Sequence, residues 1–216
     1  MRMAIASICT ARKDMGRMMV CVSLSRKVYT QLPPYPSEKA FVDATLVELE
    51  PYFHIEREVV LEHWTGKPLK VDAVMRPREP QAWKDESPVF AVEFKPPTLF
   101  HTGQGWGDTK DFTAWAAQSV DYANSLWHSA SGEQRLRVFA CPSATAPFED
   151  GLRTSGLSDP AFYMSRLLWQ LGVGELAKLE RDGWTLLGQG THVLWSESRG
   201  VHEGKHWGLT PRVGSH

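Results

Sequence analysis

Two short apolar runs that carry charged side chains constrain the fold of this chain most strongly. The first spans residues 69–75 (LKVDAVM) and the second spans residues 89–95 (VFAVEFK). β-Branched and aromatic residues dominate both runs, and proline or charged turn residues bound them, so both are predicted to be buried strands. Charged groups rarely lie in buried strands unless they are paired or bind a metal.

Asp72, Glu93 and Lys95 are the charged residues of these runs that matter most. Side chains alternate between the two faces of a strand, so Glu93 and Lys95 share one face while Val92 and Phe94 share the other. A carboxylate on each of two neighbouring strands, with a lysine two residues after the second, is typical of a metal-dependent phosphodiesterase site.

The order of these residues, D…ExK, resembles the PD-(D/E)xK nuclease superfamily, which has the restriction-endonuclease-like fold. Val71 stands where the family name has a proline, a departure that removes no chemical group. Two other D/E-x-K triplets, at residues 108–110 and 203–205, lie among glycine and polar residues with no apolar strand around them. Only the copy at residues 93–95 follows an acid-bearing strand.

The order of predicted elements also resembles this superfamily. Ser37 is a predicted N-cap, and the elements expected after it are a helix over 38–50, strands over 53–64, 69–75 and 89–95, a helix over 109–127 and a strand over 135–141. This order matches the αβββαβ core of the superfamily. The resemblance therefore implies an α/β fold with a central mixed β-sheet flanked by helices.

The remaining segments are predicted to frame this core. Residues 1–36 form a basic arm and a proline-rich linker, with six basic residues against Asp14 in the first thirty. Residues 37–145 form the nuclease-like core. Residues 146–216 form a C-terminal helix and β-hairpin extension packed on the core. The expected helix covers 160–182, broken at its glycines, and the hairpin pairs 184–195 with 201–209.

The resemblance assigns a role to each charged residue of the site. Asp72 and Glu93 bind Mg²⁺ or Mn²⁺, to which the Phe94 carbonyl adds a ligand, and Lys95 aligns or helps to deprotonate the attacking water. Glu38 matches the first-helix glutamate that often completes the metal shell; the alternative is an acid favoured by the helix dipole. Weaker acidic candidates are Glu48, Glu50 and Glu58.

Gln118 and Tyr122 match the Q-x-x-x-Y motif of RecB-like members, which implies contacts near the active site or with DNA. Their i, i+4 spacing places both on one helix face, as it also does in an ordinary helix pair. Some RecB-like members hold an iron–sulfur cluster through four cysteines. Three scattered cysteines, Cys9, Cys21 and Cys141, do not suffice for such a cluster, so none is expected.

A rival metal motif lies near the end of the chain. Residues 202–206 read HEGKH, which matches the H-E-x-x-H pattern of zinc proteases. That chemistry needs a helix that brings both histidines to one face, and the glycines at 200, 204 and 208 disfavour one. A solvated hairpin strand is the favoured interpretation of this segment.

Nine tryptophans in 216 residues is a high number. Three of them, Trp184, Trp195 and Trp207, lie in the predicted closing hairpin, where indole rings either stack on bases or fill a core. The core interpretation is favoured.

Composition and charge also bear on the expected function. Net charge is −1 and hydrophobic content is 42%, with no apolar run near the ~20 residues that span a bilayer. The favoured function is a Mg²⁺-dependent deoxyribonuclease acting on DNA in the cytoplasm, where sparse cysteines are usual. The alternative is a catalytically silent nucleic-acid-binding or assembly module on the same fold. Either function is compatible with a homodimer or a larger nucleoprotein assembly. Compact members of the superfamily are common in phages and mobile elements.

Overall fold

The computed structural model describes seven parts of the chain: residues 32, 35–83, 88–95, 109–142, 160–179, 183–188 and 192–198. The predictions for the basic arm, for the H-E-x-x-H segment and for Trp207 lie outside these residues. Within them the protein is a mixed α/β structure with one nine-stranded sheet and three α-helices.

The elements follow one another in an order that begins helix, strand, strand, strand, helix. They are α1 (Glu38–Leu49), β1 (Phe53–Glu62), β2 (Pro68–Pro77), the 3-10 turn η1 (Pro80–Ala82), β3 (Phe90–Phe94), α2 (Thr109–Ala123), β4 (Leu126–Ser129), β5 (Gly132–Arg135), β6 (Arg137–Cys141), α3 (Pro160–Gln170), β7 (Val173–Leu179), β8 (Gly183–Gly188) and β9 (His192–Ser196).

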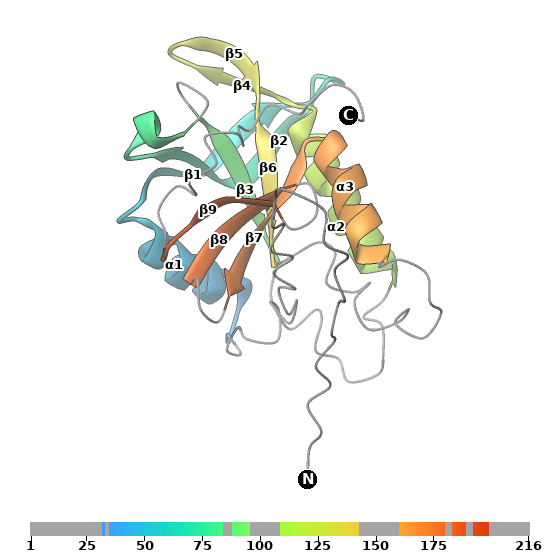
Figure 1. Cartoon of the computed structure of the whole chain (residues 1–216). Helices are drawn as coiled ribbons and strands as arrows, with labels where there is room; N and C mark the ends of the chain where they lie inside the picture. Colours follow the sequence, from blue (N-terminus) through green and yellow to red (C-terminus); the bar gives the residue numbers. More distant parts are fainter. Residues whose placement is uncertain are drawn as a thin grey trace, which may run out of the picture.

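The sheet is mixed, as the sequence predicts. Its strand order is β5-β4-β1-β2-β3-β6-β7-β8-β9. β1, β2 and β3 form an antiparallel meander, β6 runs parallel to both β3 and β7, and β7 to β9 form a second antiparallel meander. Helix α1 lies on one side of this sheet, and α2 and α3 lie together on the other (Figure 1).

Helix α1 begins where the sequence predicts. The Ser37 side chain accepts a hydrogen bond of 3.1 Å from the Ala40 amide, which satisfies one free donor of the first turn. The helix ends at Leu49, two residues before Pro51. Its buried residues line one stripe facing the sheet: Phe41, Thr45, Leu46 and Leu49.

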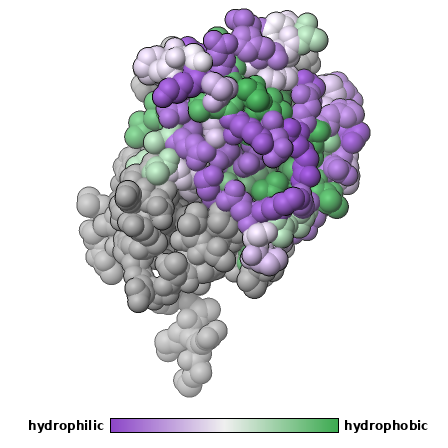
Figure 2. All heavy atoms as spheres, turned by 180° about the vertical axis from the view of Figure 1, so that it is seen from behind, coloured by the Kyte–Doolittle hydropathy of each residue, from purple (hydrophilic) through white to green (hydrophobic). Residues whose placement is uncertain are grey.

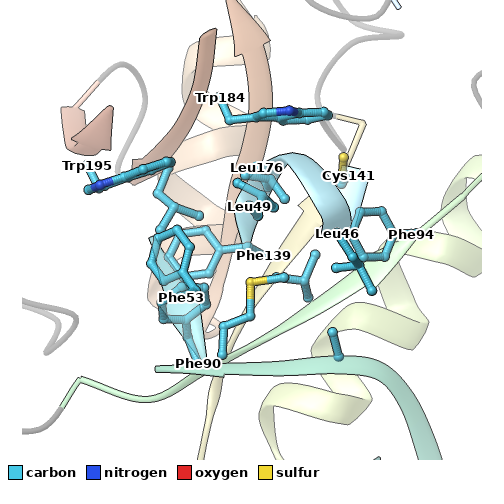
Figure 3. Close-up of a cluster of buried hydrophobic side chains, with 14 of the residues drawn as sticks. Leu46, Leu49, Phe53, Phe90, Phe94, Phe139, Cys141, Leu176, Trp184 and Trp195 are labelled. Atoms are coloured by element: carbon cyan, nitrogen blue, oxygen red, sulfur yellow. The ribbon is translucent and has the colours of Figure 1, made fainter. Parts of the chain in front are cut away.

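The core on the α1 side is rich in aromatic rings. Phe41 meets Phe94 edge-on at 5.7 Å between ring centroids, and Phe53 meets Phe90 in the same way at 5.5 Å. Trp184 and Trp195 close this cluster from β8 and β9 (Figure 3). They are only 1% and 3% exposed, which confirms the core interpretation for these two tryptophans.

Helix α2 is shorter than predicted, and the difference has a local cause. The Asn124 side chain donates to the Val120 carbonyl and the Ser125 hydroxyl donates to the Asp121 carbonyl, so short polar side chains occupy the acceptors of the last turn. Residues 126–129, partly predicted as helix, instead form β4. The β4–β5 hairpin is thereby inserted between α2 and β6.

The C-terminal prediction is wrong in two places. The expected helix over 160–182 ends at Gln170, because Gly172 adopts a left-handed φ of 89° that terminates α3. Residues 173–179 form β7, whose first half pairs in parallel with β6. The expected strand over 184–195 is two strands, β8 and β9, which pair with each other. Residues 201–209 lie outside the described part of the chain.

The described surface seen from behind is largely hydrophilic, with hydrophobic areas separated by polar side chains (Figure 2). None of the helices among the described residues has the length and apolar character needed to cross a membrane.

Candidate active site

Asp72 and Glu93 lie at the same end of the adjacent strands β2 and β3. The pairing of β2 with β3 runs from Met75–Phe90 to Ala73–Val92, and Asp72 and Glu93 are the next residue of each strand beyond that last pair. The expectation that these two strands are neighbours is confirmed, and the charge of Asp72 acts directly on Glu93.

The Asp72 carboxylate occupies a point where β2 and β3 separate. Its Oδ2 atom accepts a hydrogen bond of 2.8 Å from the Phe94 amide. The side chain therefore replaces a backbone acceptor for the Phe94 amide at the end of the ladder. One Asp72 oxygen is thus fixed by the protein backbone.

Lys95 joins the same site from the end of β3. Its Nζ atom lies 2.8 Å from Glu93 Oε1. Its own amide donates to the Cys141 carbonyl at 2.8 Å, which fixes the residue to the neighbouring strand β6. The Glu93 side chain is 3% exposed and the Lys95 side chain is 21% exposed, so the ammonium group lies between the carboxylate and solvent.

Glu93 is in an environment that disfavours its charged form. Burial, followed by the negative charge of Asp72, raises the pKa of Glu93 to about 8, and Lys95 offsets only part of this effect. The Oε2 atom of Glu93 is buried and has no hydrogen-bond partner among the described residues. The crowding of the two carboxylates therefore favours either a proton on Glu93 or a cation beside it.

Lys95 responds in the opposite direction to its surroundings. Burial favours the neutral amine, but the carboxylates of Glu93, Glu38 and Asp72 outweigh it and raise the pKa of Lys95. Glu38, at the start of α1, is thus close enough to act on the site electrostatically. Lys95 is an ammonium ion at neutral pH in the metal-free protein, so it acts as a cation and a hydrogen-bond donor.

Gln118 and Tyr122 lie together on α2 beside the strand that carries Asp72. The Gln118 Nε2 atom donates to the Tyr122 hydroxyl at 2.7 Å, and that hydroxyl donates to the Lys70 carbonyl at 2.9 Å. Burial and the charge of Glu93 raise the pKa of Tyr122. The pair therefore fixes α2 against β2 two residues from Asp72.

Two of the weaker acidic candidates have other partners. Glu58 bonds Lys70 at 2.9 Å on the exposed surface. Glu48 accepts from Lys178 at 2.6 Å and from the Trp184 indole, on the α1 side of the sheet. Neither side chain joins Asp72 and Glu93.

The backbone of Glu58, beside the site, has a conformation that the sequence pattern does not predict. Glu58 adopts a left-handed φ of 55°, rare for a residue with a side chain. The register of β1 with β2 passes from the Arg57–Ala73 pair to the Val59–Val71 pair, so Glu58 stands across from Asp72. Such strain costs on the order of 1–3 kcal/mol and often marks functional sites. A strand pattern does not reveal it, because the pattern does not encode the backbone angle.

The acidic pair suits a hard divalent cation. Among the described residues no group of three or more His, Cys, Asp or Glu side chains is placed to bind a metal. A cation at this site would therefore have two protein carboxylates, those of Asp72 and Glu93. Magnesium typically takes one or two carboxylates and retains several waters. The buried, unpartnered Glu93 oxygen and the crowding of two carboxylates fit a cation between them.

Comparison with known proteins adds no relative. No family model matches the chain, and no curated protein and no solved structure matches it significantly.

Proposed function

We propose that this protein is a metal-dependent nuclease that hydrolyses DNA phosphodiester bonds at Asp72, Glu93 and Lys95. One observation carries the proposal: the two carboxylates lie at the same end of the adjacent strands β2 and β3, close enough for Asp72 to act on Glu93, and the lysine contacts Glu93 at 2.8 Å. The D…ExK order and the elements that present it support the restriction-endonuclease-like assignment. The order α1, β1, β2, β3, α2, β6 is that of the αβββαβ core, with the β4–β5 hairpin as an insertion.

Asp72 and Glu93 are the residues that would hold Mg²⁺ or Mn²⁺. Bound there, the cation would polarise the scissile phosphate and lower the pKa of the attacking water. The Phe94 amide keeps Asp72 oriented for this role, because its hydrogen bond leaves the second carboxylate oxygen available.

Lys95 supplies fixed positive charge beside the reacting phosphate. Its ammonium group orients an attacking water through a hydrogen bond and offsets the negative charge that builds up on the phosphate oxygens. The hydrogen bond from its amide to Cys141 anchors its backbone, while the flexible stem lets Nζ move between Glu93 and substrate.

Glu38 and the Gln118–Tyr122 pair have supporting roles in this proposal. Glu38 adds negative charge toward Lys95 from α1, but it does not form a metal-binding group of three with Asp72 and Glu93 among the described residues. Gln118 retains an amide oxygen and a second N–H beyond its bond to Tyr122, and these are available to a DNA backbone at the edge of the site. Tyr122 holds the helix in place for this contact.

A cleavage assay tests the proposal. Purified protein is mixed with end-labelled single-stranded, double-stranded, circular and branched DNA, in Mg²⁺, Mn²⁺ or EDTA. We expect metal-dependent cleavage of at least one substrate, abolished by EDTA. Asp72→Asn, Glu93→Gln and Lys95→Met should each lower the rate by about 100-fold or more, because each removes a group that acts on the reacting atoms.

Glu56→Gln provides the matched control. Glu56 is an exposed acid of β1 whose Oε1 lies 2.6 Å from Arg76, away from the acidic pair. This variant should cleave at the wild-type rate. Metal-dependent DNA binding without cleavage of any substrate would instead favour the catalytically silent binding module.

A further inference from the structure

The β1–β2 turn presents a tryptophan that the fold leaves uncovered. Trp64 is 76% exposed, the highest value among the large apolar side chains that the structure describes. The other tryptophans with described side chains lie in the core or against it. An indole ring at a convex turn has a large apolar face in contact with water, which favours association with another flat apolar surface.

Hydrogen bonds within the turn hold Trp64 in a defined position. The His63 amide donates to the Lys67 carbonyl at 2.9 Å, and the Gly66 amide donates to the His63 carbonyl at 2.7 Å. Gly66 has a left-handed φ of 77°, which suits glycine at this sharp reversal. The backbone that carries Trp64 is therefore already ordered before any ligand binds.

The neighbouring histidine connects this turn to the site helix. The His63 and Trp64 rings lie 5.2 Å apart between centroids. His63 Nδ1 lies 2.7 Å from the Thr65 hydroxyl, and its Nε2 lies 3.9 Å from Asp121. Asp121 directly precedes Tyr122, whose hydroxyl bonds β2 beside the acidic pair. His63 on the turn therefore lies beside the part of α2 that contacts the strand carrying Asp72.

The turn also lies at a suitable distance from the candidate active site. Pro68, the first residue of β2, precedes Asp72 by four residues, about 13 Å at the rise of a strand. The exposed Lys67 lies on the turn itself, and the exposed Lys70 lies between the turn and Asp72. Lys70 is paired with Glu58 at 2.9 Å, so Lys67 is the cation at this turn that suits a phosphate of a nucleic-acid strand.

We propose that Trp64 is a stacking platform for an unpaired nucleobase of the DNA substrate, with Lys67 contacting the backbone. Bases inside a continuous duplex are covered on both faces by their neighbours, so an indole at a turn can stack only on an unpaired or terminal base. The site thereby favours DNA with a single-stranded segment. This inference rests on the proposed nuclease function.

A binding experiment tests the inference. Fluorescence anisotropy measures the affinity of the full chain, carrying Glu93→Gln to prevent cleavage, for a labelled 20-nucleotide oligothymidine in EDTA. A relaxed, covalently closed circular duplex, which has no terminal base, is added as an unlabelled competitor to measure duplex binding. We expect Trp64→Ala to weaken binding of the single strand about tenfold, a typical effect of one lost base–aromatic stack. Trp64→Phe should retain most of the affinity, and duplex binding should change less than about twofold.

Leu167→Ala on α3 is the control, because Leu167 is also exposed, at 54%, but lies on a different element. This variant should bind both DNAs as the parent does. Unchanged single-strand affinity in Trp64→Ala, in a protein whose wild type cleaves DNA, overturns the inference alone. Failure of the wild type to bind or cleave any DNA overturns the nuclease proposal as well. A Trp64-dependent dimer in sedimentation equilibrium would assign the indole to a second copy and also overturn the inference.

Discussion

At the scale of single residues, the sequence predicts which charged groups make up the site but not the contacts that orient them. Alternation along two buried strands predicts Glu93 and Lys95 on one face. In the structure Lys95 directly follows β3, its amide bonds the Cys141 carbonyl, and its ammonium group contacts Glu93. The hydrogen bond from the Phe94 amide to Asp72 was not predictable, since it depends on where β2 and β3 diverge. The left-handed backbone conformation of Glu58 was not predictable from the sequence either.

Glu93 should make the stability of the metal-free protein depend on pH. Its folded-state pKa of about 8 lies above the ordinary value of 4.5, so the folded protein retains a proton that the unfolded chain releases. This contribution to stability is fully present below pH 4.5 and is lost as the pH rises to about 8. We expect urea unfolding in EDTA to show a loss of about 1.4 kcal/mol per unit of pKa difference at most, a few kcal/mol in total.

Glu93→Gln is the comparison for this measurement. The amide is neutral at every pH, so the variant should lack this pH dependence and should be at least as stable as the wild type at about pH 9, above the folded-state pKa. Parallel stability profiles for the two proteins would show that Glu93 titrates normally and that Asp72 does not crowd it.

Tyr122 should contribute more through its ring than through its hydroxyl. Tyr122→Phe removes the bonds to Lys70 and Gln118 and should cost about 1 kcal/mol, whereas Tyr122→Ala should cost about 3–5 kcal/mol by leaving a cavity. Urea unfolding measures both. Gln118→Ala should weaken cleavage more than it weakens stability. Equal losses from Tyr122→Phe and Tyr122→Ala would contradict the packing role of the ring.

At the scale of elements, most helices and strands follow their local signals, whereas the β4–β5 hairpin and β7 do not. The Ser37 cap and the Asp72 and Glu93 strands lie where turn chemistry and alternation predict them. Residues 173–179 carry apolar residues that suit a helix or a buried strand equally, and pairing with β6 decides in favour of a strand. Such tertiary pairing leaves no local signal.

Gly174 shows how tightly β7 packs on its neighbours. A Cβ atom at this position would lie 2.5 Å from the Phe139 ring and 2.9 Å from the Leu187 carbonyl oxygen. Gly174→Ala should therefore destabilise the protein by about 1–3 kcal/mol, because backbone as well as a core ring must move. Thermal unfolding measures the loss. A wild-type midpoint would show that β7 does not lie against Phe139 and Leu187.

At the scale of the whole molecule, the C-terminal strands belong to the same sheet and core as the site. The sequence suggests an extension packed on a nuclease-like core, and the structure adds that one continuous sheet joins the two. Trp184 and Trp195 share a cluster with Phe53 and Phe90 from the first meander. The site strand β3 is thus supported from both directions.

Truncation after Thr145 should therefore prevent folding of residues 1–145. Removing β7, β8 and β9 would expose the rings of Phe53, Phe90 and Phe139, which the lost strands cover. We expect the fragment to show no cooperative unfolding transition by circular dichroism. A cooperative transition near the wild-type midpoint would mean that the first part of the chain folds independently.

The central claim is that Asp72 and Glu93 hold one divalent cation, and Mn²⁺ titration calorimetry in the absence of DNA tests it most directly. The account predicts one Mn²⁺ per chain for the wild type and for Glu56→Gln. Binding should be weakened by at least about tenfold in Asp72→Asn and in Glu93→Gln. Equal Mn²⁺ affinity in all four proteins, or no binding by the wild type, would contradict it.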